Sequence, residues 1–407
     1  APSRPPHLTC CYVGVAFSNM YSQAAYQGGA FRKGLLEEWL TQSKFTPKNL
    51  ELFRAHPNYD DFWKALDPER VASQVNVPTL FLGGWYDIFS AGTLNSFVTI
   101  NKQGGEGARG KCRLIMEPYG HGRSDDLVFP NASHPQSADL WNWFDLWLKN
   151  DGKGIEQIPA VQYFVMGDPS DPNTPGNRWK TADDWPIPAQ MVAVYLHTDH
   201  KLRLRASEEL FGSLSYVYDP KNPVPTIGGA NLTGSKGPKD QRPVEERSDV
   251  LLFDSPVFDR YIEFTGQVRL KFWASSTTTD TDFTAKLCDV YPDGRSIVVL
   301  DGILRASHRN SMDESEPLEP GKIYEMEIDL WSTSLTVGPG HRIRVAVSSS
   351  NAPRFEPNLN TGKPSGTNGQ TETATNTIYM NAKHPSHIVL PVTAHWPPVG
   401  EIPSTSK

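Results

Sequence analysis

Two short segments of this sequence carry residue types that catalyse acyl transfer. In the first, Gly83-Gly84-Trp85-Tyr86-Asp87, a carboxylate comes soon after the apolar run Val77 to Leu82. In the second, Tyr119-Gly120-His121-Gly122, a histidine between two glycines follows the short apolar run Arg113 to Met116. A carboxylate can accept a hydrogen bond from the Nδ1–H of an imidazole, fix its tautomer and stabilise the imidazolium formed during catalysis. Asp87 and His121 are therefore our candidate catalytic pair.

Each residue of this pair also has a purely structural explanation. Asp87 could be a turn residue or the N-cap of a helix beginning near Gly92, and His121 could lie in a surface loop. The two together are more informative, because each follows an apolar strand and one helical segment separates them. This spacing predicts that both lie at adjacent strand ends of one parallel sheet, where ligands and catalytic groups gather. In α/β-hydrolases the triad runs in the order Ser, Asp or Glu, His, and Asp87 and His121 fit the last two places.

The nucleophile of such a triad should precede Asp87 on a strand–turn–helix elbow of the G-x-S-x-G type. Ser18 follows an apolar strand, but Phe17-Ser18-Asn19-Met20 lacks the glycines of a strained elbow. No serine before Asp87 has the glycine frame; these serines are Ser3, Ser18, Ser22, Ser43 and Ser73. We therefore assign no nucleophile in this chain. We expect the elbow upstream of Ala1, in a segment lost by truncation or processing or carried by a separate chain.

The pattern of elements predicts two domains, of which the first covers residues 1–152. There strand-like runs alternate with helix-like segments, and Lys33 to Leu40, Gly92 to Lys102 and Asp139 to Leu148 are the predicted helices. This alternation indicates a parallel sheet covered by helices. The fold class is thus α/β in the first part.

The second predicted domain covers residues 153–407 and is all-β. Its short runs alternate apolar and charged residues, as in Val268 to Phe272 and Arg342 to Val345, which is typical of strands with one buried face. Turn sequences such as Pro292-Asp293-Gly294 separate these runs. The pattern predicts an antiparallel β-sandwich. Residues 218–249 are rich in Pro, Gly and charge, and we expect them to form a long surface excursion.

Composition excludes several classes of function. The net charge is −7 and the charges are mixed along the chain, without the basic stripe that binds nucleic acid. No run of eighteen apolar residues predicts a transmembrane helix. The four cysteines fit no zinc motif, and His384 and His387 flank a proline, so we predict no metal site. Asp125-Asp126 is expected to be a solvated loop. No cofactor is expected, because a catalytic triad needs none.

Several longer segments resemble the cocaine esterase and X-Pro dipeptidyl-peptidase family, also described as CocE/NonD hydrolases. Gly84-Trp85-Tyr86-Asp87 resembles the family's triad-Asp segment, and Glu117 to Gly122 resembles its G-P-W-x-H-G segment, with Glu117 and Tyr119 in place of the usual Gly and Trp. Gly28-Gly29-Ala30-Phe31-Arg32 resembles the start of its helical cap. Other segments resemble its C-terminal jelly roll: Thr281-Asp282-Phe283, Lys286 to Val290, Asp293-Gly294-Arg295 and Pro339 to Arg344.

The resemblance implies a partial α/β-hydrolase sheet, a helical cap at about residues 18–72 and a C-terminal jelly-roll β-sandwich. Members of the family cleave esters, amides or X-Pro peptides through an acyl-enzyme. Arg4 to Leu8 resembles the segment shortly after the nucleophile helix, so the family's nucleophile and oxyanion-hole residues lie N-terminal to the region matched here. Activity of this chain alone is therefore in doubt, because oxyanion donors supply roughly a hundredfold to a thousandfold in rate.

Two functions remain open at this stage. The first is a serine esterase, acylase or dipeptidyl-peptidase acting on a small ester, amide or peptide, with Trp85, Tyr86, Phe31 and Trp39 lining an acyl pocket. The alternative for these four aromatics is the hydrophobic core. The second function is a non-catalytic binding or structural jelly-roll module that has lost its nucleophile. Homo-oligomerisation, the substrate and the compartment, cytoplasmic or secreted, stay open.

Overall fold

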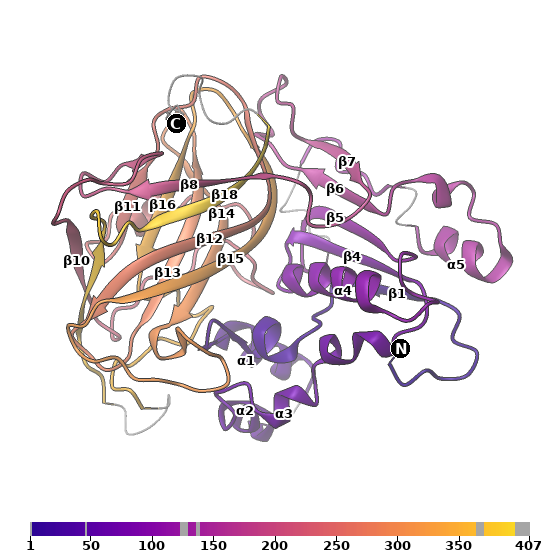
Figure 1. Cartoon of the computed structure of the whole chain (residues 1–407), viewed down its shortest axis with the longest axis horizontal. Coiled ribbons are helices and arrows are strands. Elements are labelled where there is room, and N and C mark those ends of the chain that lie inside the picture. The colour runs from indigo at the N-terminus through magenta and orange to yellow at the C-terminus, as the bar shows by residue number, and fades with distance from the viewer. Residues whose placement is uncertain (1, 45–46, 123–128, 136–138, 364–369, 395–407) are drawn as a thin grey trace, which may run out of the picture.

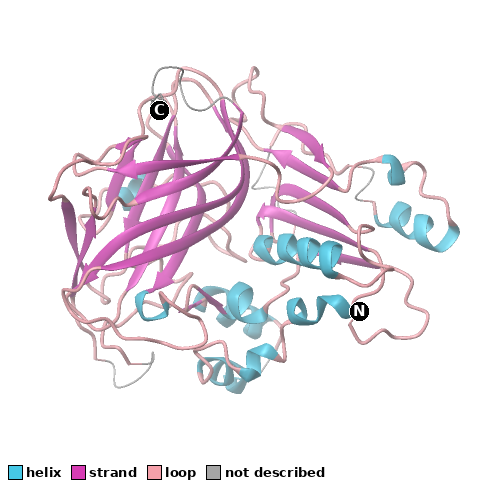
Figure 2. Cartoon of the chain, in the orientation of Figure 1, coloured by secondary structure: helices cyan, strands magenta, loops and turns pink. Residues whose placement is uncertain are grey.

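The protein consists of an α/β layer, a small helical region and a larger β-sandwich. The computed structural model describes residues 2–44, 47–122, 129–135, 139–363 and 370–394. Figure 1 shows the sandwich on one side, the α/β layer on the other, and the helical region below the gap between them. Figure 2 shows most of the helices in the α/β layer and the helical region, whereas the sandwich consists almost entirely of strands and loops. The predicted fold class, α/β followed by an all-β sandwich, is confirmed.

The α/β layer is built on a five-stranded sheet with the order β1-β4-β5-β6-β7. The first four strands are parallel, and the last pairs antiparallel to its neighbour. The apolar runs predicted as strands are buried here because parallel strands are covered on both faces. The elements of the layer are β1 (Cys11–Gly14), β4 (Thr79–Tyr86), α4 (Ser90–Gln103), β5 (Arg113–Gly120), α5 (Leu140–Lys149), η4 (Ile155–Gln157), β6 (Val161–Val165) and β7 (Arg178–Ala182).

The helical region lies between β1 and β4 in the sequence and is held together by an aromatic core. Tyr21 stacks on Tyr26 with ring centroids 4.9 Å apart, and both rings contact the fully buried Trp63. Asp60 caps one short helix by accepting a hydrogen bond from the Phe62 backbone N–H. The elements are η1 (Tyr21–Ala25), β2 (Tyr26–Gln27), β3 (Ala30–Phe31), α1 (Lys33–Gln42), α2 (Pro47–Arg54), α3 (Asp61–Lys64) and η2 (Pro68–Gln74).

The β-sandwich consists of a seven-stranded and a four-stranded sheet, and the strand ladders within both are antiparallel. Alternating residues along the long strand β12 are buried, as the alternation of apolar and charged residues predicted. The elements are β8 (Gln190–Leu196), β9 (Leu202–Arg203), β10 (Ser213–Tyr218), α6 (Arg242–Glu245), β11 (Leu251–Asp254), β12 (Ile262–Ser276), β13 (Asp282–Val290), β14 (Ser296–Arg305), η5 (Ala306–His308), β15 (Tyr324–Val337), β16 (Arg342–Ser348), β17 (Ala374–Tyr379) and β18 (His387–Ala394).

Two details differ from the sequence-based expectation. Strand β6 pairs with β5, and β7 pairs with β6, so both complete the first sheet, although the sequence pattern placed everything after residue 152 in the sandwich. The segment 218–249 is not simply a surface excursion, because Gln241 is fully buried and its side-chain oxygen accepts a hydrogen bond from the Lys286 ammonium at 2.8 Å. Both differences arise from long-range pairing, which composition and local period do not encode.

The sheets of the two parts are joined by backbone hydrogen bonds. The Met166 N–H donates to the Ser334 carbonyl at 3.0 Å, and the Thr336 N–H donates to the Met166 carbonyl at 2.8 Å. This bridge connects the end of β6 to β15 of the sandwich. Within the described ranges, none of the helices has the length and apolar character needed to cross a bilayer.

Candidate active site

The structure places Asp87 and His121 side by side at the carboxyl ends of β4 and β5. The two strands are parallel and pair Tyr86 with Gly120, so the next residue of each strand leaves the sheet at the same edge. The Nδ1 atom of His121 lies 2.9 Å from Oδ2 of Asp87. The expected contact between the two side chains therefore forms.

The carboxylate of Asp87 is fixed from several directions. Its side chain is fully buried, and Oδ1 accepts a hydrogen bond from the Phe89 backbone N–H at 2.6 Å. The Asp87 N–H donates to the Gly84 carbonyl, and the Ser90 N–H donates to the Asp87 carbonyl, both at 3.1 Å. A tight turn between β4 and α4 thus holds the second oxygen, Oδ2, toward the imidazole.

The ring of His121 has one nitrogen, Nδ1, in contact with Asp87, and among the residues that the structure describes Nε2 has no hydrogen-bond partner. Because the buried carboxylate accepts a hydrogen bond from Nδ1, we assign the proton of the neutral ring to Nδ1. Nε2 then carries the lone pair that a general base would use. The His121 side chain is 28% exposed, whereas that of Asp87 is 0% exposed. The edge-to-face contact with Phe89, at 5.4 Å between centroids and 89° between planes, also restrains the imidazole.

A close approach between the strands brings the pair together. The register shifts between Gly84 and Tyr86, so one residue of β4 faces two residues of β5, Pro118 and Tyr119. Such a bulge re-aims the residues beyond it. A Cβ atom at Gly84 would lie 2.1 Å from the Tyr119 carbonyl oxygen, so only glycine fits there.

The aromatics beside Asp87 lie in the core. The indole N–H of Trp85 donates to the Phe164 carbonyl at 2.7 Å, and its ring packs against Trp185. The hydroxyl of Tyr86 donates to the Val298 carbonyl at 3.0 Å, and burial raises the pKa of this phenol well above its usual range. Both side chains thus hold the sheet against its neighbours, and their contact with substrate stays a prediction.

The other two predicted pocket residues belong to the helical region. Phe31 is 2% exposed and packs against Tyr26, and the guanidinium of Arg54 lies 4.6 Å from its ring centroid. Trp39 is partly buried and packs against the same aromatic cluster. A role for either in binding substrate also stays a prediction.

The other residues weighed in the sequence have other partners where the structure describes them. The Ser18 hydroxyl donates to the Glu69 carboxylate and not to His121. His384 and His387 flank the turn before β18, where the ring of His387 bonds the Pro385 carbonyl. Asp125-Asp126 lies outside the described residues. In the part of the chain that the structure describes, no group of three or more His, Cys, Asp or Glu side chains could hold a metal ion.

Sequence reasoning gave no role to Arg32, which is buried next to the Asp87 turn. Its side chain is 1% exposed, and its guanidinium donates to the Ile88 carbonyl at 3.1 Å and to the Gln23 carbonyl. Burial lowers the pKa of Arg32 to about 9, although the charge of Asp87 raises it. A lone arginine in Phe31-Arg32-Lys33 carries no local sign of this long-range position.

Comparison with known proteins identifies the family. The sequence model of the X-Pro dipeptidyl-peptidase C-terminal non-catalytic domain matches residues 153–389, and that of the X-Pro dipeptidyl-peptidase (S15 family) matches residues 36–123. The cocaine esterase of Rhodococcus sp. strain MB1 Bresler is 37% identical over 358 residues, which cover 83% of this chain. This chain belongs to the cocaine esterase and X-Pro dipeptidyl-peptidase family.

Two solved structures share the fold. An aminopeptidase from a marine sediment archaeon, Thaumarchaeota archaeon, has a TM-score of 0.82 at 23% identity over 96% of this chain and 73% of its own. An α-amino acid ester hydrolase has a TM-score of 0.80 at 23% identity over 96% of this chain and 74% of its own. The chain spans 60% of the length of the cocaine esterase. The C-terminal family model begins at residue 153, although the first sheet continues through β7.

Proposed function

We propose that this protein is the part of a serine hydrolase that supplies the Asp and His of a Ser-Asp-His triad. The observation that carries the proposal is the 2.9 Å contact between Nδ1 of His121 and the buried carboxylate of Asp87. Family membership supports the reaction class. The nucleophilic serine is supplied by residues outside this sequence, in the same polypeptide or in a separate chain.

The chemistry follows from the roles of the two residues. Nε2 of His121 takes the proton of the serine hydroxyl as its oxygen attacks the carbonyl carbon of an ester or amide. The imidazolium that forms is stabilised by Asp87, and it returns the proton to the leaving alcohol or amine as the acyl bond breaks. A water molecule then attacks the acyl-enzyme, again with His121 as base, and the acid and free serine are released.

The names of the relatives suggest which substrates to test first. The relatives named above are a cocaine esterase, an aminopeptidase and an α-amino acid ester hydrolase. We therefore propose small carboxylic esters and X-Pro amides as the substrates to test first. A non-catalytic binding module remains the competing function, and the same experiments decide between the two.

The decisive experiment uses the full-length protein, or this chain together with the chain that carries the serine. Activity on p-nitrophenyl esters and X-Pro p-nitroanilides is measured for the wild type and for His121→Ala and Asp87→Asn. We expect losses of roughly 10³- to 10⁶-fold for His121→Ala and about 10⁴-fold for Asp87→Asn, because the imidazole is lost or its tautomer is wrong. Labelling by a fluorophosphonate should fall in parallel, since only an activated serine reacts readily.

The matched control is His134→Ala. His134 bonds Glu117 through Nδ1 at 2.7 Å, and its side chain is 29% exposed, close to the 28% of His121. It is also a histidine–carboxylate pair, but its carboxylate, Glu117, lies within β5 and its histidine lies outside the strands, so neither has the strand-end position of Asp87 and His121. We expect activity within a few-fold of wild type. Equal activity of His121→Ala and His134→Ala would contradict the proposal and favour a binding module.

A further inference from the structure

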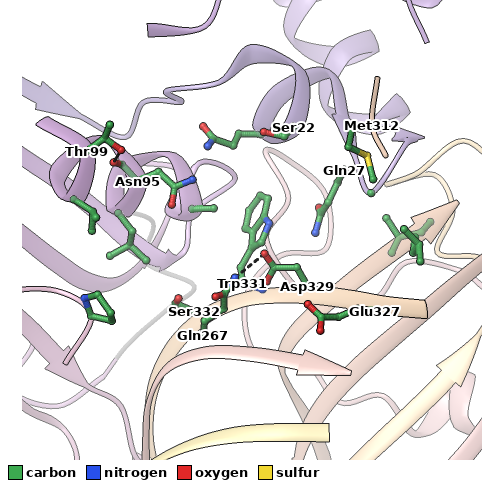
Figure 3. Close-up of a pocket in the computed structure, with 18 of the residues that line it drawn as sticks. Ser22, Gln27, Asn95, Thr99, Gln267, Met312, Glu327, Asp329, Trp331 and Ser332 are labelled. Carbon is green, nitrogen blue, oxygen red and sulfur yellow. Dashed lines mark hydrogen bonds between the residues drawn. The ribbon is translucent and has the colours of Figure 1, made fainter. Parts of the chain in front are cut away.

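A cavity of about 470 Å³ lies between three parts of the protein that are distant in the sequence. The turn that includes Gln27 forms its upper wall in Figure 3, one face of α4 forms its side, and strands of the sandwich form its floor. This volume falls within the range of small-molecule sites, which favour domain interfaces. Neither Asp87 nor His121 lines the cavity. Nothing in the proposed hydrolysis uses it.

Gln27 is buried in the wall of this cavity without a polar partner. It is 3% exposed, and neither its Nε2 nor its Oε1 forms a hydrogen bond within the described ranges. Figure 3 shows its amide pointing toward the space next to Asp329 and Trp331. A buried amide without partners costs free energy on both its donor and its acceptor side. Such a group calls for an explanation, and a ligand that bonds to it supplies one.

Asp329 presents a carboxylate to the same space. Its Oδ1 accepts a hydrogen bond from the Trp331 backbone N–H and its Oδ2 accepts one from the Gln267 amide, both at 2.8 Å. It remains accessible to solvent. Among the residues that the structure describes, no Lys, Arg or His forms an ion pair with it, whereas the neighbouring Glu327 pairs with Arg269 at 3.3 Å. Asp329 is therefore the carboxylate of this wall without a direct ion pair; burial raises the pKa of its carboxyl group, and the charge of Arg269 lowers it in part.

The backbone is distorted where these groups meet. Trp331 has φ of +70°, a left-handed conformation that costs energy for a bulky residue. The ladder between β12 and β15 shifts here, because Gln267 pairs with Ser332 while Arg269 pairs with Asp329. This bulge turns the Trp331 side chain toward the cavity, as Figure 3 shows. Local strain of this kind is often retained at binding sites.

We propose that this cavity binds a small organic ammonium ion, with Asp329 as its counter-ion and the Gln27 amide oxygen as a second acceptor. The ammonium donates hydrogen bonds to both groups, and such charge-assisted bonds are stronger than neutral ones. The hydrocarbon part of the ligand packs against Leu94, Val98 and Leu304, which line the cavity. The guanidinium of Arg32 lies 5.3 Å from the Trp331 ring centroid and does not itself line the cavity.

The experiment compares three ligands of similar shape and different charge. Binding of 2-phenylethylamine, 2-phenylethanol and 3-phenylpropanoate to the full-length protein is measured by calorimetry at pH 7. The amine should bind at least roughly tenfold more tightly than the alcohol, and the carboxylate should bind least, because only the amine pairs with the charge of Asp329. In Asp329→Asn the amine and the alcohol should bind alike, while Asp259→Asn, at an exposed carboxyl outside the cavity, should behave as wild type.

Two further variants keep the test decisive. Gln27→Met should raise Tm, because unpaired buried polar atoms are removed, and should also weaken the amine severalfold. A structural role alone would not move stability and affinity in opposite directions. The amine should bind equally to His121→Ala, which separates this cavity from the hydrolytic site. Equal affinities of the amine and alcohol for the wild type would overturn the proposal, as would loss of amine binding in His121→Ala.

Discussion

The substitution Gly84→Ala tests whether the approach of β4 to β5 is what aligns the Asp87–His121 pair. A Cβ atom at position 84 would lie 2.1 Å from the carbonyl oxygen of Tyr119 and 2.8 Å from its carbonyl carbon. Cβ atoms essentially never lie within 3.0 Å of a heavy atom outside their own residue and its chain neighbours, so the two groups must move apart by at least 0.9 Å (3.0 minus 2.1). The contact is with backbone, which has no flexible end that could move aside.

The consequence for the site can be worked from the same geometry. Tyr119 lies two residues before His121, and Gly84 accepts the hydrogen bond that closes the Asp87 turn. If Asp87 and His121 move apart by the same 0.9 Å, the distance from Nδ1 to Oδ2 grows from 2.9 to 3.8 Å, which is too long for a hydrogen bond. We expect about 1–3 kcal/mol lower stability from overpacking and roughly a hundredfold lower activity from the misplaced base.

The assay combines urea unfolding of the variant with its kcat/KM on p-nitrophenyl esters in the full-length protein. Gly14→Ala is the control, since its Cβ would meet only the Tyr12 ring at 3.7 Å, an ordinary contact in the same sheet. Gly14→Ala should retain stability and activity. If Gly84→Ala is as stable and as active as this control, close strand contact does not position the pair.

Three other predictions follow from groups outside the pair. Burial, together with the charge of Arg305, lowers the pKa of His308 from 6.5 to about 4. The unfolded chain then binds a proton that the folded chain does not, so stability present above pH 6.5 is lost as the pH falls toward 4. This loss, up to about 3 kcal/mol, should be smaller in His308→Gln when urea unfolding is compared at pH 7 and pH 4.5. Arg32→Met should lower the free energy of unfolding by about 1–3 kcal/mol, because the Ile88 carbonyl loses its donor. It should also lower kcat/KM roughly tenfold, and Arg32→Lys should recover part of both losses. An unchanged kcat/KM in Arg32→Met would contradict the idea that Arg32 positions the Asp87 turn. Burial raises the pKa of the Cys288 thiol to about 12, so Ellman's reagent should label this cysteine only after denaturation, and rapid labelling of the native protein at Cys288 would show that the sandwich core opens.

The sequence alone determined the parts of this protein that depend on local pattern. Apolar runs predicted β4 and β5, and the residues that follow them, Asp87 and His121, were expected to meet because parallel strands end at one edge of a sheet. The alternation in β12 likewise predicted a strand with one buried face. The alternation in β12 is a pattern of residues close in the sequence, and the meeting of Asp87 and His121 follows from the general rule that neighbouring parallel strands end at the same edge of a sheet.

Only the tertiary structure decided which surfaces these elements share. Trp85 and Tyr86 are the last two residues of β4, directly before Asp87, yet their polar atoms donate to the carbonyls of Phe164 and Val298, far along the chain. The cavity likewise joins Gln27 to Asp329, about three hundred residues later. These hydrogen bonds and the shared cavity produce no periodic pattern or motif in the sequence, because burial and hydrogen bonding between distant segments depend on how whole layers pack. For that reason the contact between Asp87 and His121 could be predicted from the residues, while the setting of the aromatics and the cavity could not.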